Sequence, residues 1–214
     1  MPCSATKRAS EVIEEANEDI TQDANEEANE APGNTMTEIP DMHGQQISPC
    51  LWFDDQAEEA VRFYTAIFPN SNVAAVSRYG DAGKEMHGRP PGSVMTVVFQ
   101  LSGRSLTALN GGPMFRFNEA VSLQIFCDTQ QEIDHYWEKL GEGGDPNAQQ
   151  CGWLKDKFGV SWQVVPSIVP SLVADPDNAK AQRVIAAIMA MKKLVIADLI
   201  AAASAVEEPA TVRA

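Results

Sequence analysis

Hydrophobic positions in the middle of the chain repeat at a constant offset of 73 residues. Residues 51–64 and 124–137 each begin with a strand-like apolar run and continue with apolar positions three and four residues apart, the spacing of a helix. Five positions match in kind: Phe53 with Phe126, Asp55 with Asp128, Glu59 with Glu132, Phe63 with Tyr136, and Tyr64 with Trp137. The pattern predicts two copies of a strand–helix unit.

Each predicted helix has start and stop signals. Asp55 with Glu58 can cap the first helix, and Thr129 with Glu132 forms a capping box for the second. Pro69 ends the first helix. The buried face of the first helix is predicted at Ala57, Ala60, Val61, Tyr64 and Phe68. The second helix presents Ile133, Tyr136, Trp137 and Leu140, and stops at Gly141.

Further strand-like runs follow each helix. They occupy residues 72–79, 93–101 and 104–109 in the first half, and about 150–155 and 160–165 in the second. A second match, at offset 56, aligns the glycine-led segments 103–107 and 159–163. We therefore predict an α+β fold of two βαβββ modules, 47–112 and 118–166, the second shorter, forming a curved mixed sheet around a cleft.

Residues 167–204 are predicted to be helical. Asp177 or Asn178 can cap a helix that runs to about Met191, and a second helix is predicted over 193–203. Their apolar faces must cover the sheet or a partner, so we expect a homodimer. Residues 205–214 are expected to be a flexible C-terminus.

The charge of the chain excludes several classes of partner. Of 214 residues, 30 are acidic and 16 are basic, a net charge of −14. A nucleic acid or an anionic membrane surface requires a cationic face, so we expect neither as a partner. No run approaches the roughly 20 apolar residues of a membrane span.

The acidic excess is concentrated in residues 1–46, which hold eleven acidic and two basic residues, a net charge of −9. This segment has no aromatic residue and is predicted to be disordered or a frayed helix. It lacks the apolar region of a secretory signal. It is either a dispensable extension or an acidic docking tail, and we place the folded domain at 47–204.

The four cysteines are Cys3, Cys50, Cys127 and Cys151. None forms a C-x-x-C pair, so neither a zinc site nor a redox motif is indicated. We expect reduced thiols in a cytoplasmic protein, with Cys151 the one to test for reactivity.

Several motifs carry a resemblance to a known family. They are Cys50–Phe53, Leu109–Pro113, Gln150–Asp156 (QCGWLKD), Phe158–Gln163 (FGVSWQ) and Met191–Lys193. Over about residues 47–204 the chain resembles the PhnB-like branch of the vicinal oxygen chelate superfamily, which includes glyoxalase I, extradiol dioxygenases and bleomycin-resistance proteins. This branch carries the family label 3-demethylubiquinone-9 3-methyltransferase. The resemblance implies a homodimer, with a cleft on the concave face of the sheet.

The metal enzymes of this superfamily place ligands on the first and last strands of each module. Alignment puts Pro49 and Ser122 at the first-strand positions, and Thr107 and Gln163 at the last-strand positions. Proline offers no ligand atom, and the others are weak neutral donors. We therefore predict no metal and no cofactor. Methyl transfer by a nucleotide-binding fold is not indicated either, because Gly111–Gly112 is followed by Pro113 rather than by a helix.

The predicted cleft suits a small organic molecule, because it combines aromatic walls with a few neutral polar groups. Its candidate residues are Phe53, Thr107, Asn110, Ser122, Cys151, Trp153 and Gln163. The alternative is that these side chains are buried for structural reasons. Lys155 and Asp156 are expected to be an exposed turn pair. The glycine- and proline-rich segment 80–92 is either a lid or an ordinary connection.

Three functions remain open. The chain is a metal-free enzyme of unknown reaction, a binder that sequesters a small molecule, or the methyltransferase of the family label. For the binder, the acidic composition favours cationic planar ligands.

Overall fold

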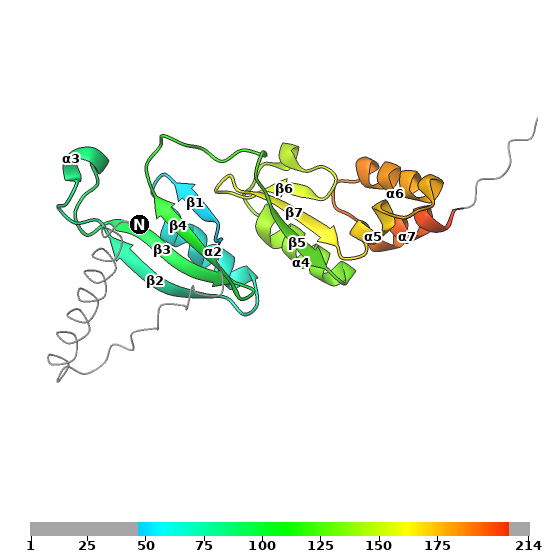
Figure 1. The fold of residues 1–214 in the computed structure, drawn as a ribbon, viewed down its shortest axis with the longest axis horizontal. Helices are drawn as coiled ribbons and strands as arrows, with labels where there is room; N and C mark the ends of the chain where they lie inside the picture. Colours follow the sequence, from blue (N-terminus) through cyan, green and yellow to red (C-terminus); the bar gives the residue numbers. More distant parts are fainter. Residues whose placement is uncertain (1–46, 206–214) are drawn as a thin grey trace, which may run out of the picture. The chain divides into compact units, whose positions relative to one another are not determined.

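The computed structural model describes residues 47–205, so the predictions for 1–46 and most of the C-terminal segment lie outside the described residues (Figure 1). Along the chain the strands are β1 (Cys50–Phe53), β2 (Asn72–Arg78), β3 (Val94–Leu101), β4 (Arg104–Asn110), β5 (Leu123–Cys127), β6 (Trp153–Lys155) and β7 (Ser161–Pro166). The helices are α2 (Ala57–Ile67), α3 (Lys84–His87), α4 (Gln130–Gly141), α5 (Val169–Val173), α6 (Asn178–Ala190) and α7 (Ile196–Ser204), with a short 3₁₀ helix, η2, at Pro146–Ala148.

The first module forms a four-stranded mixed sheet, which we call sheet A, in the order β1-β4-β3-β2. β1 is parallel to β4, and the other neighbours are antiparallel. Alternation turns Leu51, Val97, Phe99 and Ala108 toward α2, and all four are buried. The helix face predicted from the sequence packs against them.

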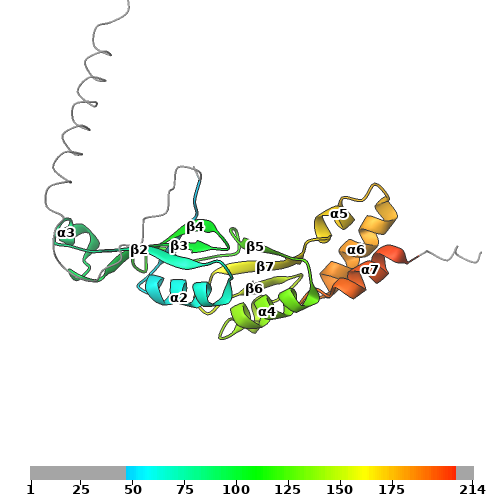
Figure 2. The same cartoon turned by 90° about the horizontal axis from the view of Figure 1, so that it is seen from below.

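The second module repeats this plan with one strand fewer. Its sheet B has the order β5-β7-β6, with β5 parallel to β7. α2 and α4 lie on the same side of the two sheets (Figure 2). The α+β class and the duplicated modules are confirmed, and the strands hydrogen-bond within each module as two mixed sheets. We call the face of each sheet that lies opposite its helix the open face.

The strand register corrects the alignment of the two modules. Thr107 lies opposite Cys50 and Gln163 lies opposite Gln124, so the first strands correspond at an offset of 74 rather than 73. The connection from strand to helix is one residue shorter in the second module, and a one-residue slip exchanges the two faces of a strand. Phe53 therefore corresponds to buried Cys127, and not to Phe126, which is 54% exposed.

The two helix starts differ in how they are capped. Thr129 accepts from the Glu132 amide and the Glu132 carboxylate reaches back, so the predicted capping box is confirmed. The prediction that Asp55 caps α2 is wrong. The Oδ1 atom of Asn110, at the end of β4, accepts the Ala57 amide at 2.8 Å. A tertiary contact thus replaces a local cap.

A buried carboxylate joins the modules. Asp156 is 3% exposed and accepts hydrogen bonds from the Tyr64 hydroxyl and the Trp162 indole, both at 2.8 Å. It also accepts the amides of Phe158 and Val160. The expected exposed turn pair of Lys155 and Asp156 is therefore wrong for Asp156, which organises the junction between α2 and β7.

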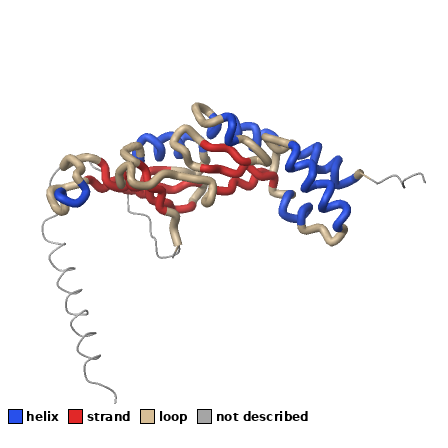
Figure 3. The backbone as a smooth tube through the Cα atoms, turned by 90° about the horizontal axis from the view of Figure 1, so that it is seen from above, coloured by secondary structure: helices blue, strands red, loops and turns tan. Residues whose placement is uncertain are grey.

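The C-terminal helices pack mainly on one another. Leu172, Val184 and Leu199, one from each helix, form a hydrophobic cluster separate from that of the modules. The backbone tube shows these helices grouped together towards the C-terminal end of the described chain (Figure 3). Asp177 caps α6, as one of the two predicted alternatives required. α7 begins at Ile196, three residues later than expected. Within residues 47–205, no helix combines the length and apolar character needed to cross a membrane.

A tight turn ties this helical segment to the second module. Cys151 and Gly152 both have positive φ, and their amides donate to the carbonyls of Met191 and Lys192 at 2.8 Å. Leu194 packs at the glycine, where a Cβ would lie 3.1 Å from its side chain. Two sequence motifs separated by about 40 residues, 150–156 and 191–193, therefore meet in the structure.

Candidate functional site

Three of the predicted cleft residues lie around the open face of sheet B. The Gln163 amide donates to the Ser122 hydroxyl at 2.7 Å and accepts from the Gln124 amide at 3.2 Å. Trp153 is the cross-strand neighbour of Gln163 and is half-buried. Thr107 has the equivalent place in sheet A, beside Cys50. The structure thus brings Ser122, Trp153 and Gln163 together.

The other predicted cleft residues have structural roles in the fold. Asn110 is buried, and besides capping α2 it donates from Nδ2 to the Val94 carbonyl at 3.1 Å. Phe53 is buried and makes edge contacts with Phe117 and Phe158. Cys151 occupies the tight turn, with its Sγ 3.6 Å from the Met189 Sδ. These three side chains belong to different local environments.

The donor set of the superfamily's metal position does not fit a divalent metal. With the corrected register, the open-face neighbours of Thr107 and Gln163 are Cys50 and Gln124, in place of Pro49 and Ser122. This set contains one thiol and no imidazole or carboxylate. Burial raises the pKa of Cys50, which opposes formation of the thiolate. Among residues 47–205, no three His, Cys, Asp or Glu side chains are grouped to hold a metal ion.

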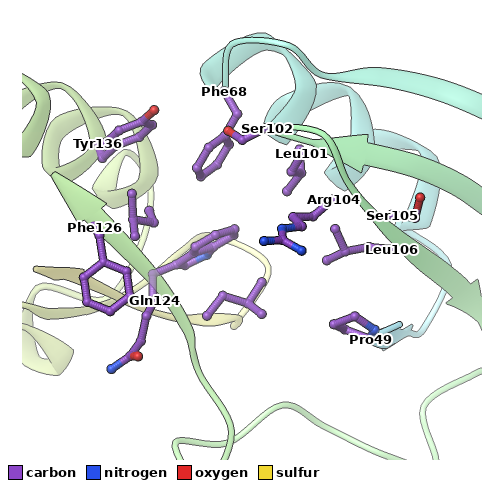
Figure 4. Close-up of a pocket in the computed structure, with 13 residues that line it drawn as sticks. Pro49, Phe68, Leu101, Ser102, Arg104, Ser105, Leu106, Gln124, Phe126 and Tyr136 are labelled. Atoms are coloured by element: carbon purple, nitrogen blue, oxygen red, sulfur yellow. The ribbon is translucent and has the colours of Figure 1, made fainter. Parts of the chain in front are cut away.

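A cavity of about 450 Å³ lies where the two modules meet, and we call it the inter-module cavity (Figure 4). None of the seven predicted cleft residues lines it. Its wall comprises Pro49, Phe68, Leu101, Ser102, Arg104, Ser105, Leu106, Leu123, Gln124, Ile125, Phe126, Tyr136 and Trp162. This size falls in the usual range of small-molecule sites, about 300–1,000 Å³.

Aromatic rings form one wall of the cavity. Phe68, just beyond α2, stacks on Tyr136 of α4 with ring centroids 5.0 Å apart, and on Trp162 of β7 at 5.4 Å. The indole nitrogen of Trp162 donates to Asp156, which holds this ring in place. Burial, followed by the nearby Cys127 and Glu132, raises the pKa of Tyr136, so its hydroxyl stays neutral. The wall is a preformed apolar surface contributed by both modules.

Among the described residues that line the cavity, Arg104 is the one with a charged side chain. It is the first residue of β4, directly after a tight turn in which Ser102 and Gly103 have positive φ. Its side chain extends between the two walls, whereas the Gln124 amide points away from them (Figure 4). Arg104 is not among the cleft residues predicted from the sequence. The available signal was the alternation along β4, which places Arg104 on the same face as Leu106 and Ala108.

Segment 80–92, for which the sequence left open a lid or an ordinary connection, lies outside the wall of this cavity. Segment 80–92 contains the short helix α3 and is held to the end of β1, where the Arg89 guanidinium donates to the carbonyl and the carboxylate of Asp54. The rings of Tyr79 and His87 contact each other at 4.5 Å. The segment is therefore tied down next to β1 by specific contacts.

The chain is similar to a known family over its modules. Residues 45–165 match the family model described as 3-demethylubiquinone-9 3-methyltransferase. A putative 3-demethylubiquinone-9 3-methyltransferase, the PhnB protein from Bacillus cereus, is 35% identical over 57% of this chain and 99% of that one, with a TM-score of 0.49.

More distant solved structures also match. A protein from Staphylococcus aureus is 27% identical over 56% of this chain and 94% of that one, with a TM-score of 0.24. The fosfomycin resistance protein FosX from Mesorhizobium loti is 14% identical over 56% of this chain and 88% of that one, with a TM-score of 0.40. No curated protein matches the sequence.

Proposed function

We propose that this chain, which belongs to the PhnB-like 3-demethylubiquinone-9 3-methyltransferase family, binds a small organic molecule in its inter-module cavity without a metal ion. The observation that carries the proposal is a cavity of about 450 Å³ whose apolar wall both modules supply. Binding there removes ligand surface from water at about 25 cal/mol per Å². The wall is held by the stacked rings and the Asp156 hydrogen bonds, so little ordering accompanies binding.

Binding is a better supported function than methyl transfer. The segment that follows β4, residues 111–122, contains no helix, so Gly111–Gly112 lacks the strand–turn–helix context of a nucleotide-type methyl donor site. The family label and the name of the Bacillus cereus relative describe those proteins. For this chain, whether binding is followed by turnover is decided by recovering the ligand after incubation.

We also propose that two copies of the chain associate, in a reducing cytoplasm. The loop between the modules exposes large apolar side chains at Met114, Phe115 and Val121, which a second copy would cover. Cys50, Cys127 and Cys151 are free thiols, which fits a reducing compartment. Light scattering after size exclusion should give twice the chain mass, and a monomer at micromolar concentration would contradict the association.

A thermal-shift screen of the full chain tests the binding function. The panel contains divalent metals, S-adenosylmethionine and small aromatic, quinone and charged molecules. A ligand present at about 100 times its Kd should add about 2.7 kcal/mol of stability. We expect a shift with an organic ligand and none with metals, and a shift with metals alone would contradict the proposal.

Two matched variants locate the site. Phe126 lines the cavity and Phe115 does not, yet the two residues are similarly exposed, at 54% and 58%. Phe126→Ala should weaken ligand binding several-fold, because it removes part of the apolar wall. Phe115→Ala should leave the Kd unchanged, because this residue belongs to the proposed association surface and lies outside the cavity wall. Equal effects of the two substitutions would place the ligand elsewhere.

A further inference from the structure

The charge inside the inter-module cavity is opposite to that of the chain. The protein carries a net charge of −14, yet within residues 47–205 the cavity wall holds no acidic side chain and one basic residue, Arg104. The other polar members of the wall are neutral: Ser102, Ser105, Gln124 and the Tyr136 hydroxyl. An organic cation would meet this guanidinium with no acidic group of the wall to balance it. The local charge therefore favours an anion.

Arg104 is also without a protein partner for its guanidinium among residues 47–205. Three other arginines have partners: Arg62 pairs with Glu58, Arg89 with Asp54, and Arg183 donates to the carbonyls of Ala202 and Ala203. Arg116 also has no partner among residues 47–205, but it lies outside the wall of this cavity. A guanidinium offers five N–H donors in a planar fork, a geometry that matches carboxylates and phosphates. No group within the described part of the chain occupies the donors of Arg104, so they are available to a ligand.

The backbone fixes where this cation stands. Leu101 and Arg104 are directly paired across the tight turn of β3 and β4, so their side chains leave the same face of sheet A. Leu106, two residues further along β4, lies on that face as well. The guanidinium is thus held at the end of sheet A, between the apolar surface of that sheet and the Phe68 ring (Figure 4). Trp162 also lines the cavity.

We propose that the inter-module cavity takes an amphipathic organic anion, whose carboxylate, phosphate or sulfonate group binds Arg104 and whose apolar body lies against the aromatic wall. This inference rests on the proposed binding function and names the ligand class for the same cavity. A charged group at one end and an aromatic surface at the other fix both the position and the direction of the ligand. The charge of this ligand is opposite to that of the cationic ligands expected from the acidic composition of the chain.

Three probes with one apolar body and different heads test the inference on the full chain. They are 1-naphthoate, 1-naphthalenemethanol and 1-naphthylmethylammonium, titrated by calorimetry at low salt. The anion should bind at least tenfold more tightly than the neutral alcohol, and the cation more weakly than either, because only the anion pairs with the guanidinium. Naphthyl phosphate and naphthalenesulfonate then rank the oxyanions.

Matched variants assign the preference to one residue. Arg104→Gln should remove the tenfold preference for the anion and leave the alcohol's Kd nearly unchanged. Arg104→Lys should keep part of the preference, because it retains the charge but not the planar fork. The control Arg62→Gln makes the same change in net charge at an exposed residue of α2 outside the cavity wall. It should bind all three probes as the wild type does.

The outcomes separate this inference from the function on which it rests. If alcohol, anion and cation bind equally well, or if Arg104→Gln keeps the preference, the anion inference is wrong while small-molecule binding stands. If none of the probes binds at millimolar concentration, the cavity is not a binding site and both are wrong. Circular dichroism of Arg104→Gln checks folding, which we expect to be intact because the side chain lies outside the core.

Discussion

At the residue scale, the most constrained polar group is Asp156. Its two carboxylate oxygens accept four donors, two from side chains and two from the backbone, at 2.8–3.0 Å. Burial raises the pKa of Asp156, even though these donors act in the opposite direction. All four neighbours of this side chain are donors, so the residue at position 156 must offer acceptors only. A carboxylate meets this requirement, whereas an amide brings an NH₂ donor of its own.

Asp156→Asn should therefore destabilise the protein by about 2–4 kcal/mol, since the new NH₂ group faces buried donors. For a chain of this size that corresponds to a fall in Tm of roughly 4–15 °C. The matched control is Asp128→Asn, at an exposed residue in the connection before α4, and it should leave the Tm nearly unchanged. Equal Tm values for the two variants would show that the Asp156 network does not hold the modules together.

Tyr64 makes a prediction about pH. Burial first, and then the Asp156 carboxylate, raise the pKa of Tyr64 well above its usual value. Its hydroxyl therefore keeps its proton in the folded state above pH 10, where the unfolded state loses it. The unfolded state then binds fewer protons, so the free energy of unfolding falls as pH rises.

Tyr64→Phe should cost about 1 kcal/mol at neutral pH, from the lost hydrogen bond to Asp156. Above about pH 10 the wild type should lose about 1.4 kcal/mol per pH unit through Tyr64, a term absent from the variant. The stability difference between the two should thus shrink between about pH 9 and pH 11 in urea titrations. A difference that stays constant would mean that Tyr64 ionises equally in both states.

At the element scale, α2 and α4 correspond in the sequence repeat but begin in different ways. α4 carries its own capping box, whereas α2 depends on an amide from β4. The Asn110 side chain also donates a hydrogen bond to the Val94 carbonyl of β3, so it joins the start of α2 to two strands of sheet A. The stability of α2 is therefore coupled to the sheet more tightly than that of α4.

Asn110→Ala should lower the free energy of unfolding by about 2–3 kcal/mol, because it removes the cap and a second buried hydrogen bond. Asp55→Ala should change it by less than about 0.5 kcal/mol, as for an exposed residue without a structural role. Both values come from urea denaturation. A larger effect at Asp55 than at Asn110 would mean that Asp55 caps α2 after all, as expected from the sequence.

At the scale of the whole molecule, the helical segment after the modules is joined to them mainly through its linker. Leu194 is almost fully buried. The Gln130 side chain holds the backbone here through two hydrogen bonds: it donates to the Leu194 carbonyl at 3.2 Å and accepts from the Ile196 amide at 2.9 Å. Together with the amides of Cys151 and Gly152, these bonds position the linker on the second module.

Leu194→Ala should destabilise the protein by about 2–4 kcal/mol, through lost burial and the cavity that remains. Hydrogen exchange should rise first in α6 and α7, because their attachment is the contact removed. Ile200→Ala is the control, since that side chain is 47% exposed and should cost less than about 1 kcal/mol. Unchanged exchange in α6 and α7 would mean that other contacts hold these helices.

The sequence by itself determined the duplicated α+β architecture, the buried faces of α2 and α4, the α4 capping box and the Asp177 cap. These features arise from residues close together in the chain, where the helical and strand periods and the cap positions follow from local geometry. The glycine-led match at offset 56 also predicted the correspondence of β4 and β7 through Thr107 and Gln163.

Only the tertiary structure decided which polar residues meet. The one-residue difference between the strand–helix connections reversed the matching of Phe53 and Phe126, because a strand changes face at every residue. The burial of Asp156 depends on Tyr64, 92 residues away, and the cavity around Arg104 is closed by a helix and strands of the other module. Contacts over such distances depend on how the modules pack, which local periodicity does not encode.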